Sequence, residues 1–353
     1  MKGVYFDGSK AVYREDLPMP EPKNGHSRIR VLYANVCSTD KEILKGYRPQ
    51  FHGVMGHEFV GIVDKTDRPE LLGKTVVGEL NEGCGSCLYC RSGREKHCPD
   101  RKVIGLDGLD GCFAEYFVEA DHLIHVVPDG LPPEQAVYTE PLAAALEIPV
   151  QVHMDPRKNV AIIGDGRLAF MIAQVLYLTG AHLTVIGKHR EKLDAFMPFA
   201  EKTRKAEEFS VTANPGQTGN TFAKNDHHAE DNANAEENIY TENAALAHDP
   251  DRTYEVVIEA TGSPDGIKLA QKIVRRQGTI ILKSTYAGMT EIDMSLFVVN
   301  EITLVGSRCG PFEPALRLIQ KGMIRFPEVE WHELRDYEAA FISKAFKAGF
   351  RIP

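Results

Sequence analysis

The stretch Val160-Ala161-Ile162-Ile163-Gly164-Asp165-Gly166-Arg167-Leu168-Ala169 decides the fold of the second half of this chain. Its first four residues form an unbroken apolar run, which is typical of a parallel strand covered on both faces. The pattern G-x-G-x-x-A follows at once, and apolar residues then recur at helical spacing up to Leu176. A strand, a glycine-rich turn and a helix in this order form the dinucleotide-binding fingerprint. The alternative is an ordinary glycine turn, which requires neither the strand before it nor the helix after it. The sequence therefore predicts an α/β fold with a doubly wound parallel sheet.

Two turns are expected to hold the dinucleotide. The first supplies the predicted contacts Gly164, Gly166, Arg167 and Leu168. The second follows the apolar run 183–186 and reads Gly187-Lys188-His189-Arg190. An acid that would hold the ribose hydroxyls of NAD is missing at that strand end, and small and basic residues suit a 2′-phosphate. We therefore expect NADP, with NAD as the alternative; otherwise Lys188 and Arg190 would only begin a surface helix.

The first half of the chain offers nitrogen, oxygen and sulfur donors for a metal. Gly56-His57-Glu58 places an imidazole beside a carboxylate, and Cys37 lies 20 residues upstream. A His-Glu pair alone is more often a surface feature, but Glu140 adds a further carboxylate. Three such ligands with one position left open make a catalytic zinc site. We expect Cys37 and His57 to bind zinc, with Glu58 or Glu140 completing the set.

Four cysteines predict a second zinc site. Cys84, Cys87, Cys90 and Cys98 follow the spacing C-x2-C-x2-C-x7-C. Four thiolates close a tetrahedron around zinc and leave no position for substrate, so this site is structural. An iron–sulfur cluster or disulfides are the alternatives. The other two cysteines, Cys112 and Cys309, are interpreted as small buried residues.

Composition excludes several classes of function. The 353 residues suggest two or three domains, and the net charge of −9 without a long basic run argues against nucleic acid and anionic membranes as partners. No apolar stretch has the 18 residues of a membrane span, and residues 1–7 do not resemble a signal peptide. With four of the seven cysteines crowded together, we expect a reducing, cytoplasmic location.

Further elements are expected on both sides of the fingerprint. The predicted strands are 28–33, 60–63, 75–78, 111–118, 256–262, 278–282 and 302–306, and the predicted helices are 266–275 and 313–321. Residues 205–252 are polar and poor in apolar side chains, which predicts a mobile surface insertion. His227-His228 within it is interpreted as part of a solvated loop rather than a metal site.

In combination, these motifs resemble the zinc-dependent medium-chain alcohol dehydrogenases over nearly the whole chain. Cys37-Ser38-Thr39-Asp40 is similar to the family's Cys-Gly-Thr-Asp, with serine in place of glycine. Gly56-His57-Glu58 matches its Gly-His-Glu, and the four cysteines match its structural-zinc lobe. Glu140-Pro141-Leu142 resembles the polyol, sugar and threonine branch, where the classical alcohol branch has a cysteine. Glu42 stands where some members have a relay histidine, and residues 205–252 have no counterpart.

The resemblance implies a domain plan. It gives a GroES-like β-barrel catalytic domain at 1–148, a Rossmann domain at 149–307, and a segment 308–353 that returns to the catalytic domain. Family members form dimers and tetramers, which implies a homodimer or homotetramer.

The resemblance also implies a reaction: hydride transfer between an alcohol (polyol, sugar or small secondary alcohol), or its carbonyl product, and NAD(P). Thr39 would take the substrate proton and pass it toward Asp40 or Glu42, with Glu58 as a further catalytic group. One alternative is a non-catalytic nucleotide sensor or structural protein on the same fold. Another is a zinc-free quinone or enone reductase, although such proteins lack the predicted zinc ligands.

Overall fold

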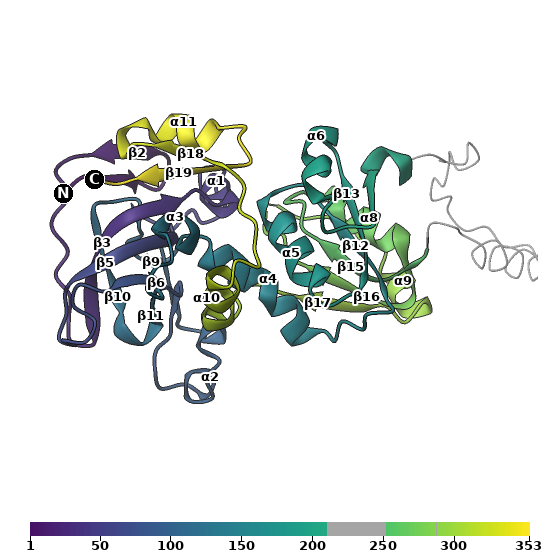
Figure 1. Ribbon diagram of the computed structural model, residues 1–353, viewed down its shortest axis with the longest axis horizontal. Helices are drawn as coiled ribbons and strands as arrows, with labels where there is room; N and C mark the ends of the chain where they lie inside the picture. The colour runs from purple at the N-terminus through teal and green to yellow at the C-terminus, as the bar shows by residue number, and fades with distance from the viewer. Residues whose placement is uncertain (210–251, 287) are drawn as a thin grey trace, which may run out of the picture.

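The computed structural model describes residues 1–209, 252–286 and 288–353. Two β-rich units lie side by side, and helix α4 (Thr139–Gln151) runs between them (Figure 1). Both chain termini lie in the same unit (Figure 1). This unit is therefore built from the two ends of the chain, and the other unit from its middle.

The middle unit is a parallel sheet of six strands in the order β14-β13-β12-β15-β16-β17. The strands are β12 (Asn159–Ile163), β13 (His182–Gly187), β14 (Lys202–Lys205), β15 (Tyr254–Glu259), β16 (Val274–Leu282) and β17 (Thr303–Gly306). The order reverses between β12 and β15, which is the point where doubly wound sheets bind nucleotides. The α/β fold with a Rossmann-type sheet is therefore confirmed.

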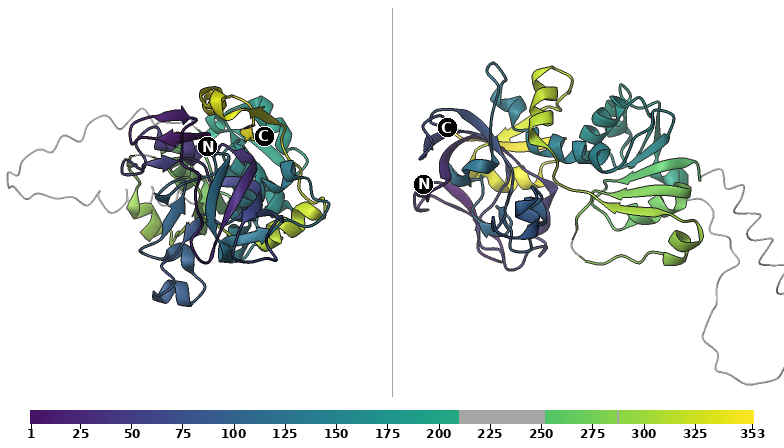
Figure 2. Two further views of the ribbon diagram at one scale, coloured as in Figure 1. Left: turned by 90° about the vertical axis from the view of Figure 1, so that its left-hand side faces the viewer. Right: turned by 90° about the horizontal axis from the view of Figure 1, so that it is seen from below.

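Helices cover both faces of this sheet (Figure 2). They are α5 (Arg167–Tyr177), α6 (Arg190–Leu193), η3 (Asp194–Phe196), η4 (Ala206–Phe209), α8 (Asp265–Ile273) and α9 (Met294–Val299). Val160 and Ile162 of β12 pack into one apolar cluster, and Ala161 and Ile163 into another on the opposite face. This two-sided burial explains why the strand is an unbroken apolar run.

The other unit centres on a mostly antiparallel sheet in the order β11-β6-β5-β3-β19-β18, with β10 also paired to β3. Its strands are β3 (His26–Asn35), β5 (Glu58–Lys65), β6 (Thr75–Gly78), β10 (Tyr116–Ala120), β11 (Ile124–Val126), β18 (Val329–His332) and β19 (Lys347–Arg351). Burial alternates along β3, as the period-2 pattern of its sequence predicts. The C-terminal strand β19 pairs with β3 and completes this GroES-like unit.

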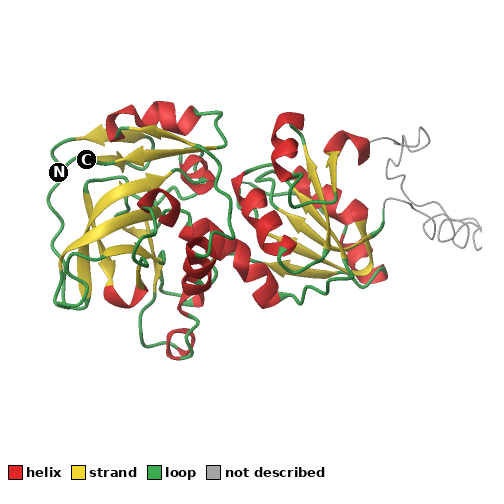
Figure 3. Ribbon diagram, in the orientation of Figure 1, coloured by secondary structure: helices red, strands yellow, loops and turns green. Residues whose placement is uncertain are grey.

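Shorter elements surround this sheet (Figure 3). The strands are β1 (Gly3–Phe6), β2 (Ala11–Arg14), β4 (Gly53–Val54), β7 (Asn81–Glu82), β8 (Lys102–Ile104) and β9 (Gly108–Leu109). The helices are α1 (Ser38–Ile43), α2 (Leu88–Arg91), η1 (Glu95–His97), η2 (Asp121–Leu123), α3 (Pro133–Ala136), α10 (Phe312–Gln320), η5 (Leu334–Asp336) and α11 (Tyr337–Ile342). No helix in the described ranges has the length and apolar character needed to cross a membrane.

Several predicted boundaries were wrong, among them the start of the predicted strand 278–282, which begins at Val274 as β16. The predicted strand 111–118 begins only at Tyr116, because 111–113 bonds instead to residues 54–56 beside the metal ligands. The predicted insertion starts later than expected, since β14 ends at Lys205 and Phe209 is 2% exposed. The remainder of the predicted insertion up to 251, with His227-His228, lies outside the described residues.

Candidate active site

A cavity of about 710 Å³ opens between the two units and is lined by residues of both. Its size suits a small-molecule site. The predicted site residues on its wall are Cys37, Thr39, His57, Glu58, Glu140, Gly164, Gly166, Arg167, Leu168, Gly187, Lys188 and His189. Asp40, Arg190 and the four cysteines of the second predicted zinc site are not on the wall. The cavity therefore joins the metal-ligand motif to the dinucleotide turn.

Donor atoms of Cys37, His57 and Glu58 all lie within 4.8 Å of one another. Cys37 precedes α1, and His57 and Glu58 stand at the start of β5. Gly56 has φ +94°, and a Cβ atom there would meet the Phe113 ring at 2.2 Å. Only glycine fits at this position, so the backbone turns sharply and presents His57 to the cavity. A sulfur, nitrogen and oxygen set with this spacing fits a zinc ion.

Asp40 lies beneath this cluster and fixes two of its members. Its Oδ2 accepts a hydrogen bond from the Cys37 backbone N–H at 2.7 Å, and its Oδ1 lies 3.2 Å from His57 Nδ1. Burial lowers the pKa of His57, but the Asp40 carboxylate and the Cys37 sulfur together outweigh that effect and raise the pKa well above its usual value. With Nδ1 facing a carboxylate, Nε2 is the nitrogen left for a metal.

The two candidate carboxylates differ in their surroundings. Glu58 Oε2 accepts a hydrogen bond from Lys347 Nζ at 2.5 Å, and both side chains are 2% exposed. Glu140 lines the cavity but does not belong to the 4.8 Å set. Burial and the neighbouring Glu58 charge raise the pKa of Glu140 to about 7. Glu58 is thus the carboxylate nearer to Cys37 and His57.

Cys84, Cys87, Cys90 and Cys98 form a second cluster within the same 4.8 Å limit. None of them is in a disulfide. The Cys87 sulfur accepts the Cys90 backbone N–H at 3.5 Å, which is typical of a thiolate loop around a metal. Within the lobe, Glu95 Oε1 accepts the Gly83 N–H at 2.6 Å, and Lys96 Nζ ties the lobe to the protein by donating to Glu147 Oε1 at 2.6 Å. Four sulfurs with this geometry fit a closed zinc site.

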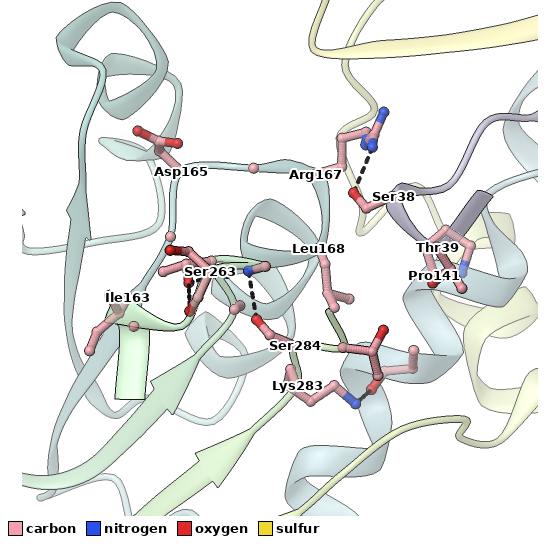
Figure 4. A pocket seen from close by; sticks show the side chains of 18 of the residues that line it. Ser38, Thr39, Pro141, Ile163, Asp165, Arg167, Leu168, Ser263, Lys283 and Ser284 are labelled. Carbon is pink, nitrogen blue, oxygen red and sulfur yellow. Dashed lines mark hydrogen bonds between the residues drawn. The ribbon is translucent and has the colours of Figure 1, made fainter. Parts of the chain in front are cut away.

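At the other end of the cavity lies the glycine-rich turn. Gly164 has φ +133°, and a Cβ atom would meet the Ala260 carbonyl oxygen at 2.6 Å. Arg167 begins α5, and its Nη2 donates to Ser38 Oγ at 2.9 Å, joining the two units (Figure 4). The turn and the helix N-terminus thus face the cavity, where a pyrophosphate would bind.

Asp165 was missed by the sequence analysis. Its Oδ2 accepts the backbone N–H groups of Lys188 and His189, both at 2.7 Å, and lies 3.0 Å from His189 Nδ1. The strand end at Gly187 has no acid of its own, yet the structure places a carboxylate over it. An acid between the two glycines of the fingerprint was the available signal.

Lys283, Arg308 and Cys309 also line the cavity and were not predicted. Lys283 Nζ donates to Ala144 O, Ser307 Oγ and Arg308 O at 2.7, 3.2 and 3.0 Å (Figure 4). Burial lowers the pKa of Lys283 to about 8. The interpretation of Cys309 as a plain buried residue was wrong, whereas Cys112 is fully buried. Basic residues directly after two apolar strands were the signal for Lys283 and Arg308.

The chain is similar to known proteins. The model of the alcohol dehydrogenase GroES-like domain matches residues 23–129. D-arabitol-phosphate dehydrogenase from Enterococcus avium is 27% identical, over 91% of this chain and 89% of that protein. Sorbitol dehydrogenase from Halalkalibacterium halodurans is 25% identical, over 96% and 93%. The structure of galactitol-1-phosphate dehydrogenase from Escherichia coli has a TM-score of 0.79 at 22% identity, with 100% of both chains covered.

Fold and site together define a two-unit dinucleotide-binding protein with a metal-ligand cluster in the shared cavity. Residues 23–129 match the alcohol dehydrogenase GroES-like domain, and over nearly its whole length the chain is similar to polyol dehydrogenases and to structures of zinc-binding dehydrogenases.

Proposed function

We propose that this protein is a zinc-dependent oxidoreductase that transfers a hydride between an alcohol and a nicotinamide coenzyme. The observation that carries the proposal is the shared cavity: the Cys37, His57 and Glu58 cluster and the Gly164–Leu168 turn line the same space. A sensor would not need a metal-ligand cluster facing the coenzyme. The catalytic function is therefore favoured over the non-catalytic alternative.

Cys37, His57 and Glu58 would hold the catalytic zinc, and the four-cysteine lobe the structural zinc. A zinc ion in the cavity supplies Lewis-acid chemistry, which lowers the pKa of an alcohol hydroxyl. Lys347 holds one oxygen of Glu58, leaving the other toward the cluster. We assign Glu140 to the cavity wall, as an acid close to the metal ligands rather than one of them.

Thr39 is the proposed proton acceptor. Its Oγ1 lies 3.8 Å from Cys37 Sγ, on the cavity wall. Asp40, predicted as a relay, is 0% exposed and occupied by Cys37 and His57, so we assign it a positioning role. The outward route then leads from Thr39 to solvent without Asp40.

We propose NADP as the preferred coenzyme, because Gly187 and Lys188 line the cavity at the end of β13. Arg190 lies off the wall and contacts Asp194, so Lys188 is the cation that supports this preference. The negative charge of the Asp165 carboxylate, which lies at the same strand end, would repel a 2′-phosphate. NAD remains the alternative coenzyme.

The relatives named for D-arabitol phosphate and sorbitol support a polyol or sugar as the alcohol. We further propose a cytoplasmic enzyme that forms a homodimer or homotetramer. The domain division 1–148, 149–307 and 308–353 stays a proposal too; its first boundary falls inside α4.

The test is a panel of polyols, sugars and small secondary alcohols, run with the zinc-loaded protein and each coenzyme. We expect reduction of NADP by at least one polyol or sugar. Cys37→Ser should lose the catalytic zinc and lower kcat by at least about 100-fold, while the circular dichroism spectrum and the structural zinc are retained. A folded Cys37→Ser variant with full activity would overturn the assignment.

A further inference from the structure

Arg308 enters the cavity from the segment that follows β17 and is only partly buried. Its one hydrogen bond to a side chain is long, from Nη1 to Asn81 Oδ1 at 3.4 Å. No carboxylate of the described residues lies within 4.0 Å of its guanidinium nitrogens. By contrast, Arg28 contacts both Asp64 and Glu21. Arg308 therefore brings a positive charge to the cavity wall without an acidic partner among the described residues.

Two more arginines stand near it. Burial lowers the pKa of Arg308, and repulsion from Arg101 and Arg48 lowers it further. Arg101 Nε is buried without a hydrogen-bond partner, and neither Arg101 nor Arg48 forms an ion pair in the described part of the chain. Three unneutralised guanidiniums in a chain of net charge −9 are electrostatically unfavourable. Such an arrangement is expected where a ligand supplies the negative charge.

The segment that carries Arg308 is fixed beside the metal ligands. Lys283 Nζ donates to the Arg308 carbonyl oxygen at 3.0 Å, and Asn81 Nδ2 donates to Cys309 Sγ at 3.3 Å. Arg308 and Cys309 line the same cavity as Cys37, His57 and Glu140. An anion on Arg308 would therefore be near enough to belong to the same small molecule as the reacting hydroxyl.

The coenzyme does not account for this charge. Its pyrophosphate is expected at the N-terminus of α5, on the turn that begins at Gly164. Arg308 instead contacts Asn81 of the catalytic unit, and its two neighbouring arginines come from that unit as well. Of the three arginines only Arg308 is on the cavity wall, and Arg48 and Arg101 act on its charge from the catalytic unit.

We propose that the substrate carries an oxyanion, a phosphate monoester or a carboxylate, in addition to its reacting hydroxyl, and that Arg308 binds this oxyanion. The fork of a guanidinium matches either group with two parallel hydrogen bonds. Arg48 and Arg101 add positive potential that attracts the anion without touching it. The inference rests on the proposed dehydrogenase function and narrows its substrate to an anionic polyol or sugar.

The test compares matched substrates that differ only in charge: D-arabitol, galactitol and glycerol against their phosphate esters and against the corresponding sugar acids. We expect kcat/KM to be at least about 10-fold higher for one anionic series than for the neutral series. The phosphate and carboxylate arms identify which oxyanion the site prefers. Equal or better kcat/KM for the neutral alcohols would overturn the proposal.

Variants test whether Arg308 causes the preference for anionic substrates. Arg308→Gln should lower kcat/KM for the anionic series by at least about 30-fold, a much larger factor than for the neutral series, because one charged hydrogen-bonding group is removed. Arg308→Lys should restore part of the loss. Arg276→Gln, at an exposed position on β16, removes the same charge away from the cavity and is the control. An anionic preference that survives in Arg308→Gln would contradict the assignment.

A binding measurement separates this proposal from the proposed activity. The thermal midpoint of the zinc-loaded protein is measured with inorganic phosphate and with galactitol 1-phosphate, neither of which needs to react. An increase that disappears in Arg308→Gln supports the anion site even if no alcohol is turned over, in which case only the dehydrogenase function has failed. No Arg308-dependent increase with either probe overturns the anion site, whatever the activity.

Discussion

Asp165 sets the charge at the end of β13, where the adenosine ribose of the coenzyme is expected to bind. A Cβ atom on Gly187 would lie 2.8 Å from Asp165 Oδ2, so this carboxylate occupies the space that a side chain at 187 would take. Burial raises the pKa of Asp165, but the N–H groups of His189 and Lys188 outweigh it and hold the pKa below its usual value. The group is therefore ionised at neutral pH, and it contacts the backbone of Lys188.

The first prediction concerns this carboxylate. Asp165→Asn keeps an oxygen for the two N–H groups but removes a negative charge that repels a 2′-phosphate. We expect the ratio of kcat/KM for NADP to that for NAD to rise about 10-fold, or about 1.4 kcal/mol. Asp67→Asn, at an exposed position, is the charge-matched control. An unchanged ratio would mean that Asp165 does not meet the ribose.

A second prediction concerns Glu119 on β10, which is 1% exposed and whose Oε2 has no hydrogen-bond partner. Burial, with repulsion from Glu82 and Glu79, raises its pKa well above the usual 4.5. The folded state thus favours the protonated form. As pH rises above about 4.5, the unfolded chain loses this proton first, and the free energy of unfolding falls until the folded pKa is reached.

Glu119→Gln removes this pH-dependent penalty. We expect the variant to be more stable than the parent at pH 8 by at least about 1 kcal/mol, since each unit of pKa shift is worth about 1.4 kcal/mol, and the difference to vanish near pH 4. Chemical denaturation at both pH values measures it. Glu191→Gln, at an exposed position, should show no such trend. A destabilised variant at pH 8 would refute the role given to Glu119.

At the scale of elements, the sequence predicted what local patterns encode. The strand β12 and helix α5 carry their own apolar periodicity, and β6 was predicted with its observed bounds, Thr75–Gly78. The failures have tertiary causes. The segment 111–113 has the composition of a strand but pairs with the loop at Gly56, and no local pattern encodes that partner. Whether a lone charged residue such as Arg308 ends in a cavity likewise depends on the packing of distant segments.

The four-cysteine lobe gives the third prediction. The residues 83–98 contain only α2 and η1, of 4 and 3 residues, so a zinc ion rather than apolar packing is expected to order them. Cys87→Ser should lower the thermal midpoint by several degrees and remove one zinc per chain, measured by calorimetry and elemental analysis. Arg91→Gln changes an exposed, non-ligand side chain of α2 and is the control. Loss of zinc without a lower midpoint would contradict a stabilising role.

At the scale of the whole molecule, the chain ends cooperate in building the site. The strand β19 adds to β3, and its first residue, Lys347, reaches the Glu58 carboxylate 289 positions earlier in sequence. Arg167 of the middle unit meets Ser38 beside Cys37 in the same way. Ligands, coenzyme turn and supporting cation therefore come from three stretches of chain, and the metal-ligand cluster depends on the C-terminal strand of its own unit.

The last prediction tests that dependence through the Lys347–Glu58 pair. Lys347→Met leaves a carboxylate buried without its cation, which costs about 3–5 kcal/mol in comparable pairs. Adding Glu58→Gln removes the unpaired charge, so the double variant should regain at least half of the lost stability. Chemical denaturation of the parent, the two single variants and the double variant, all at one zinc concentration, gives the coupling free energy between Lys347 and Glu58. The zinc content of each protein is measured as well. A loss below about 1 kcal/mol in Lys347→Met, or a double variant no more stable than that single variant, would show that the C-terminal strand does not support the metal cluster through this pair.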